Sequence, residues 1–290
     1  MQLFERVEAD AAAALPLAGP LPTPTATPPP AAPVGPHPLR SLGKMSFGLR
    51  RILTTLAGRG IGPTVLLGDR GPHRGVAFVD VDLAALEARM RPLGVTVNDA
   101  LLASAAAGYV AALSAADEQL PTELPVSIPV ALRRQGMSNN QVGVMLVQLP
   151  LSVPEPDARL LLIAARTRAE KGRARGQGTL EFMRGPLGAR IMDRVARRQH
   201  IAAGFITNLP GPSDRICLAG APIVSIWPVA VLAGNVRLGV AAVSYTGRLR
   251  CGIHFDETTV PGAVFARAMS NELRRLAGHT VPPDRPGNRL

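Results

Sequence analysis

The side chains able to carry acid–base or metal chemistry are few, and they are scattered along the chain. The five histidines are His37, His73, His200, His254 and His279. None falls in an HExxH spacing, and the sequence has no GxSxG, Walker or EF-hand pattern. The common catalytic and metal-binding motifs are therefore absent, and we expect no metal and no cofactor.

One combination of chemically able residues is local. His254 and Asp256 alternate with apolar neighbours, and Ser244 precedes them across an expected turn. Such a set can act as base, acid and nucleophile. A polar or interdomain surface is the favoured interpretation, because both side chains fall on the polar side of a strand. His200 ends an arginine-rich helix, where a cation suits the helix dipole better than a base.

The two cysteines, Cys217 and Cys251, form no CxxC pair. Both lie in apolar, strand-like runs. We expect buried free thiols in a reducing compartment, rather than a disulfide or a metal site.

A rigid turn follows a strand-like run in "FITNLPGP", which contains Asn208, Pro210, Gly211 and Pro212. Asn at a strand end is typical of a turn closed by its own side chain. Alternatively, the prolines hold the amide of Asn208 at a binding site, because rigid supports position a site better than mobile loops. The sequence leaves both interpretations open.

The formal net charge is +11 and the isoelectric point is about 11.2, carried almost entirely by arginine. The charge indicates nucleic acid, an anionic membrane or an anionic molecule such as coenzyme A as a partner. An arginine-rich codon bias of a GC-rich genome is the favoured explanation. With aromatic residues at only 3%, stacking on bases is disfavoured, and we expect no nucleic acid partner.

The elements that must position these residues begin after a low-complexity region. We interpret residues 1–10 as a helix remnant, 11–40 as a disordered proline-rich linker with ten prolines from Pro16 to Pro38, and 41–74 as a basic amphipathic segment. Residues 75–278 form the predicted folded domain, and 279–290 a disordered tail.

Within that domain, periodicity predicts an α+β fold with a mixed or antiparallel sheet and flanking helices. We expect strands over 75–81, 126–132, 142–149, 204–208, 222–229, 238–245 and 249–255. We expect helices over 82–91, from Thr96 onward, and over 158–171, 180–199 and 261–276. Thr96 or Asn98 caps the long helix, and Asp99 suits its first turn.

Three ordered stretches resemble one known family. They are "VTVNDALLASAAAGY" (95–109), "FITNLPGP" (205–212) and "IVSIWPVAVLAGNVRLGVAAVSYTGRLRCGIHFD" (223–256). Together with "LPVSIPVALR" and "NNQVGVMLVQLPL", they are similar to the C-terminal half of the bacterial wax ester synthase/diacylglycerol O-acyltransferase family. The resemblance covers about 75–278.

The resemblance implies one half of a coenzyme A-dependent, chloramphenicol acetyltransferase-like fold, with a substrate tunnel between two domains. Asn98 and Asp99 match the family's ND pair, which we interpret as structural support near that cleft. Trp227 and Pro228 are expected at the tunnel wall or domain interface, with plain core as the alternative for Trp227.

The implied activity is transfer of a fatty acyl group from acyl-CoA to diacylglycerol or a long-chain alcohol. The family's catalytic HHxxxDG motif is absent here, and "MQLFERV" resembles the helix that follows it. We therefore expect inactivity without a second half that supplies the base. A non-catalytic lipid- or partner-binding homologue is the alternative. Expected partners are acyl-CoA, the lipid acceptor, an N-terminal half or a second copy, and a membrane or lipid droplet touched peripherally from the cytoplasm.

Overall fold

The computed structural model describes residues 60–131, 142–174, 196–212 and 214–279, together with Arg190 and Arg194. The predicted helix remnant, the linker and most of the basic segment lie outside these residues. So do most of the helix predicted over 180–199 and nearly all of the predicted tail.

Six strands form one mixed sheet in the order β1-β8-β7-β4-β2-β3. They are β1 (Arg74–Asp82), β2 (Glu123–Ala131), β3 (Val142–Pro150), β4 (Gly204–Pro210), β7 (Leu238–Tyr245) and β8 (Arg248–Asp256). Strands β2, β4 and β7 run parallel, and the other neighbours pair antiparallel. The mixed sheet predicted from the sequence is confirmed, and a small hairpin of β5 (Cys217–Leu218) and β6 (Ala221–Pro222) stands apart from it.

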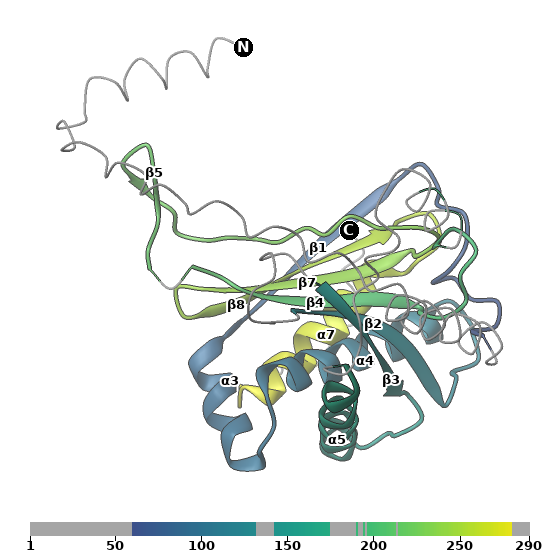
Figure 1. The fold of residues 1–290 in the computed structure, drawn as a ribbon, viewed down its shortest axis with the longest axis horizontal. Helices are drawn as coiled ribbons and strands as arrows, with labels where there is room; N and C mark the ends of the chain where they lie inside the picture. The colour runs from purple at the N-terminus through teal and green to yellow at the C-terminus, as the bar shows by residue number, and fades with distance from the viewer. Residues whose placement is uncertain are drawn as a thin grey trace, which may run out of the picture.

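Helices cover one face of the sheet (Figure 1). They are α3 (Leu83–Met90), α4 (Val97–Ala115), α5 (Pro156–Ala174) and α7 (Gly262–Leu276), with the short 3-10 helix η1 (Arg91–Leu93) after α3. One side of every strand buries its aliphatic residues against this layer, as Val126, Ile206 and Val240 do. The strand period of two therefore decides which face carries the core.

Helix α4 is long and apolar enough to cross a membrane by length and composition. However, 67% of its apolar window is buried inside the domain. Tyr109 on this helix packs edge-on against Phe265 of α7, with ring centroids 5.0 Å apart. This burial and packing show that α4, the helix expected from Thr96 onward, is a core helix of the domain.

The β7–β8 hairpin turns through Thr246 and Gly247, at φ 47° and 74°. Two successive residues of positive φ match the right-handed twist of the flanking strands. The predicted hairpin is confirmed in register, with Tyr245 opposite Arg248.

Residues 223–233, which we call the strap, run across the face of the sheet that the helices leave open (Figure 1). The prediction of a strand over 222–229 is wrong, because only Ala221 and Pro222 pair, within β6. The strap lies so close that a Cβ at Gly252 would overlap the carbonyl oxygen of Pro228. It covers the sheet instead of joining its edge, and Pro228 has no N–H to donate to a ladder.

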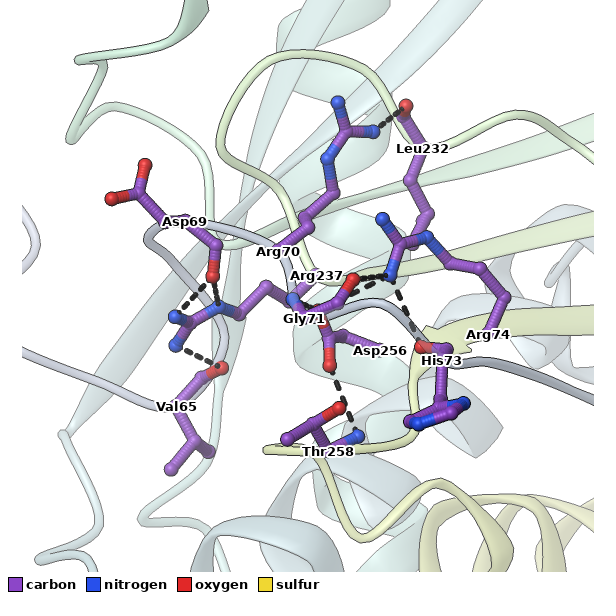
Figure 2. A network of polar contacts seen from close by, with 10 residues as sticks. All are labelled: Val65, Asp69, Arg70, Gly71, His73, Arg74, Leu232, Arg237, Asp256 and Thr258. Atoms are coloured by element: carbon purple, nitrogen blue, oxygen red, sulfur yellow. Dashed lines mark hydrogen bonds and ion pairs between the residues drawn. The ribbon is translucent and has the colours of Figure 1, made fainter.

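A buried carboxylate fastens the chain that leads into β1 (Figure 2). Asp256 is fully buried, and it accepts from the backbone N–H groups of Gly71 at 2.5 Å and Thr258 at 3.0 Å. Arg74 approaches the same carboxylate at 3.5 Å. The expectation that Asp256 lies on a polar surface is therefore wrong, because the incoming loop covers it.

Arginines complete this network (Figure 2). Arg237 donates to the carbonyl oxygens of Asp69 and Val65, at 3.0 Å and 3.3 Å, and its own carbonyl accepts from Asp256 N at 2.9 Å. Arg70 donates to the carbonyl oxygen of Leu232 at the end of the strap. Loop, strap and β8 are thus joined at one corner of the domain.

Cys251 is buried in β8 as expected, whereas Cys217 is exposed on the β5–β6 hairpin. The prediction of two buried thiols is wrong for Cys217, because its apolar run projects from the sheet instead of crossing it.

We predict that Asp256→Ala lowers the free energy of unfolding by about 2–3 kcal/mol, because two backbone donors lose their acceptor and Arg74 loses its counter-charge. Asp80→Ala is the matched control on the neighbouring strand. Asp80 pairs with Arg248, and both side chains are more than a third exposed, so a loss of at most about 1 kcal/mol is expected. Chemical denaturation measures both variants, and equal losses would contradict the prediction.

Candidate functional site

The site predicted from the sequence falls at one end of the sheet. The parallel strands β4 and β7 end together, with Pro210 opposite Ser244. Helix α4 turns back into β2, so its N terminus lies toward the same end as the carboxyl ends of β2 and β4 (Figure 1). This end therefore receives Asn98, Asp99 and the segment 208–212, and the carboxyl ends of parallel strands are a common place for ligands.

Asp99 is a structural cap. Its carboxylate accepts from the backbone N–H of Thr96 at 2.9 Å and from the Thr96 hydroxyl at 2.6 Å, while Thr96 Oγ1 accepts from Asp99 N at 3.2 Å. The hydroxyl of Thr167 on α5 donates to its other oxygen at 2.5 Å. Of the two caps proposed from the sequence, the structure selects Thr96, and both oxygens of Asp99 are engaged.

Asn98 is the second residue of α4 and is half-buried. Unlike Asp99, its side-chain amide makes no hydrogen bond to another described residue. The ND pair is thus divided: Asp99 holds the helix, and Asn98 keeps its amide available.

Asn208 lies on the helix-facing side of β4. The alternation places it with Ile206 and Gly204, and a Cβ at Gly204 would overlap the hydroxyl of Tyr109 on α4. Asn208 Oδ1 is buried and has no hydrogen-bond partner within the described part of the chain. A buried acceptor without a donor destabilises the fold. Asn208 Oδ1 is therefore a candidate for a hydrogen bond to a bound ligand.

The turn after Asn208 is held by close backbone contact. A Cβ at Gly211 would overlap the carbonyl oxygen of Ser244 at the end of β7, so only glycine fits there. Leu209, Pro210 and Pro212 are exposed. The turn is thus exposed to solvent, and β7 fixes it from one side.

Trp227 and Pro228 belong to the other face of the sheet, on the strap. The Trp227 ring lies 5.1 Å from that of Phe78, and the guanidinium of Arg250 lies 5.5 Å from the indole. Trp227 is 39% exposed, so the plain-core interpretation is wrong. The structure therefore places Trp227 and Pro228 on the opposite face of the sheet from Asn208.

A second tyrosine, which the sequence reasoning missed, holds the base of the β5–β6 hairpin. The hydroxyl of Tyr245 accepts from Ile216 N at 3.1 Å and donates to the carbonyl oxygen of Ile223 at 2.9 Å. Ile223 N also donates to Ile216 O at 2.9 Å. The only sequence signal was the position of Tyr245 at the end of a strand.

The histidines in the described residues do not form a catalytic set. His254 Nδ1 lies 2.7 Å from the carbonyl oxygen of Ala230, and His200 Nδ1 lies 3.2 Å from that of Ile61. A carbonyl only accepts, so both Nδ1 atoms carry the proton. With Asp256 held by Gly71 and Thr258, the set of Ser244, His254 and Asp256 imagined from the sequence does not assemble.

Buried nucleophiles are also held neutral. Burial, with a smaller contribution from the charge of Asp80, raises the pKa of the Cys251 thiol to about 12. Burial alone raises the pKa of the Tyr109 phenol. Among the described residues, no group of three or more His, Cys, Asp or Glu side chains is arranged to hold a metal ion.

Comparison with known proteins gives one consistent result. Residues 138–277 match the family model of the WS/DGAT C-terminal domain. A probable diacylglycerol O-acyltransferase of Mycobacterium tuberculosis is 30% identical over 210 residues, which cover 68% of this chain and 45% of the relative. The O-acyltransferase WSD of Acinetobacter baylyi is 24% identical over 208 residues, covering 69% and 45%.

The fold agrees with these relatives. The wax ester synthase/diacylglycerol acyltransferase of Marinobacter aquaeolei VT8 superposes with a TM-score of 0.59 at 21% identity, over 82% of this chain and 58% of that chain. This likeness supports one half of a coenzyme A-dependent acyltransferase fold. The chain spans about half the length of the curated relatives that it matches.

We predict that Asp99→Ala lowers the free energy of unfolding by about 1–2 kcal/mol, because the capping box and the bond from Thr167 are lost. Asn98→Ala should change stability by less than about 0.5 kcal/mol, since its amide holds no described residue. Thermal and chemical unfolding of the two neighbouring variants measure the contrast. A large loss for Asn98→Ala would show that this amide is structural.

Proposed function

The chain carries a C-terminal domain of the wax ester synthase/diacylglycerol acyltransferase family, and from this premise we propose that it contributes one half of an O-acyltransferase. The reaction is transfer of a fatty acyl group from acyl-CoA to diacylglycerol or a long-chain alcohol. The domain match over residues 138–277 carries the proposal. Acyl-CoA is a substrate in it, and no separate cofactor is needed.

The end of β4 supplies the binding side of this reaction. A lipid alcohol carries a hydroxyl donor, and Asn208 Oδ1 is a buried acceptor that lacks one. The Asn98 amide lies toward the same end of the sheet, and the fixed turn at Gly211 keeps the strand end in place. In this arrangement the two amides orient the acceptor lipid rather than move its proton.

The proton must go to a base from elsewhere. Attack of a hydroxyl on a thioester requires a proton acceptor in the transition state. His200 and His254 each bond to a backbone carbonyl, and the sequence contains no HHxxxDG. We therefore place the catalytic base on a second half-domain, and losing a general base costs about 10²–10⁴-fold in rate.

The β5–β6 hairpin and the strap form the surface for that second half. Their outward side chains are apolar and exposed: Ile216, Leu218, Val224, Val229 and Val231. Leu218 is 73% exposed on a hairpin that Tyr245 fixes at its base. Several large aliphatic side chains on one projecting segment are typical of an interface.

A non-catalytic homologue that binds a lipid or a partner is the second candidate. It is favoured by one observation, that the sequence contains no HHxxxDG motif. In either case the positive charge favours anionic partners, such as the phosphates of coenzyme A or a membrane or lipid-droplet surface reached peripherally from the cytoplasm.

We predict that the chain alone does not consume acyl-CoA with hexadecanol or diacylglycerol, and that adding the HHxxxDG-bearing half of a relative restores turnover. In the mixture, Asn208→Ala should lower kcat/KM about tenfold, because one hydrogen bond to the acceptor is lost. Asn271→Ala on α7 is the control and should keep full activity. Turnover by the chain alone would overturn the placement of the base, whereas a mixture that stays inactive favours the non-catalytic homologue.

We also predict self-association of the isolated chain, because its exposed apolar hairpin has no partner. Light scattering at increasing protein concentration should show a rising average mass. The double variant Leu218→Ser, Val224→Ser should shift the distribution toward monomer, while Leu161→Ser at an exposed position of α5 should not. A wild-type monomer at high concentration would contradict the proposed interface.

A further inference from the structure

Arg250 is a buried charge on the open face of the sheet. It lies on β8 and is only 9% exposed. One side-chain bond holds it, from Nη1 to the carbonyl oxygen of Tyr245 at 3.2 Å. Its Nε is buried and has no acceptor within the described part of the chain. A guanidinium has five N–H donors, so most of the hydrogen-bonding capacity of Arg250 is unused.

The carboxylate opposite Arg250 is engaged by another arginine. Asp80 stands directly opposite Arg250 in the β1–β8 register. Its Oδ2, however, accepts from both Nε, at 3.0 Å, and Nη2 of Arg248. Trp227 of the strap supplies a cation–π contact at 5.5 Å, which offsets only part of the cost of a buried charge.

Apolar side chains lie on the same face of the sheet as this charge. Trp227 is 39% exposed, Phe78 is 52% exposed and Val76 is 42% exposed. The rings of Phe78 and Trp227 touch, with centroids 5.1 Å apart. We call these three residues the ledge. Water thus meets an apolar ledge beside an arginine that forms no ion pair with any carboxylate of the described residues.

We propose that Arg250 and the ledge bind an amphiphilic anion, meaning an oxyanion headgroup on an alkyl tail. The headgroup accepts from the free N–H groups of Arg250, and the tail lies along Trp227, Phe78 and Val76. A carboxylate or a phosphate monoester matches the planar fork of a guanidinium. Neither alone would use the ledge, and an uncharged lipid would leave the guanidinium unpaired.

This site is distinct from the end of β4. Arg250 faces the strap, whereas Asn208 faces the helices on the opposite side of the sheet. The proposal therefore goes beyond acyl transfer, and it concerns the chain without a second half, which would lie over the strap that carries Trp227.

Trp227 is the only tryptophan in the chain, so its fluorescence reports directly on the site. The full chain is titrated with dodecanoate and with dodecyl phosphate below their micelle concentrations, and with dodecan-1-ol and inorganic phosphate as separate arms. We expect saturable changes with the two anionic amphiphiles, which also show which headgroup binds more tightly. Dodecan-1-ol and inorganic phosphate should each bind at least about tenfold more weakly.

Two variants with opposite expected effects test the residue. Arg250→Gln should weaken dodecanoate binding about tenfold, because the charge-assisted pair is lost. Asp80→Asn removes a competing carboxylate and releases Arg248, so binding should stay equal or tighten. Arg89→Gln, the same charge change on the exposed side of α3, is the matched control and should leave the affinity unchanged.

Circular dichroism and thermal unfolding check that each variant folds. If Arg250→Gln does not fold, the four ligand titrations of the wild-type chain and the affinity of Asp80→Asn still test the proposal. Equal affinity for dodecanoate and dodecan-1-ol would overturn the proposal, and so would inorganic phosphate binding as tightly as dodecyl phosphate. A folded Arg250→Gln with unchanged affinity, or weaker binding by Asp80→Asn, would overturn it as well.

Discussion

The buried carboxylate of Asp256 is the interaction on which the rest of the domain depends. It sits at the end of β8 and gathers the N–H groups of Gly71 and Thr258 together with the charge of Arg74. A desolvated carboxylate is stable only when its oxygens are satisfied, so the loop before β1 must close over it. The same corner fixes Arg70, which reaches the strap at Leu232. The positions of β1 and the strap therefore follow from one satisfied charge.

The strap gives the sheet a second covering layer made without secondary structure. Its backbone carbonyls are used one at a time: Pro228 O rests on Gly252, Ala230 O meets His254, and Leu232 O meets Arg70. Each contact requires a sheet residue of suitable size below the carbonyl. At position 252 only glycine fits, because a Cβ there would overlap Pro228 O. The helix-covered face is thus left for the core and the end of β4, while the strap face holds Trp227 and Arg250.

Much of the scaffold could be predicted from periodicity, because local forces decide it. The alternation in β8, the turn at Thr246 and Gly247, and the cap at Thr96 each depend on neighbours in sequence. The strap could not be predicted, because an apolar segment that pairs at a sheet edge and one that crosses a sheet face have the same sequence pattern. Cys217 was misplaced for that reason.

The candidate site was likewise predictable only in part from the sequence. The sequence placed Asn98, Asp99 and 208–212 together as motif residues. Only the structure shows that Asp99 is fully engaged while Asn208 Oδ1 has no donor. The missing donor depends on which distant side chains surround β4, and no local pattern carries that information.

The chemistry of acyl transfer shows which catalytic groups the proposed second half must supply. The reaction needs a proton acceptor, donors for the developing oxyanion and walls that hold two long substrates. Under the proposed function the domain supplies rigid walls and orienting amides, and two of its four described histidines, His200 and His254, bond to backbone carbonyls. Under the proposed function, the asparagine acceptor that lacks a donor at the end of β4 orients a substrate whose proton is removed by a base of the second half.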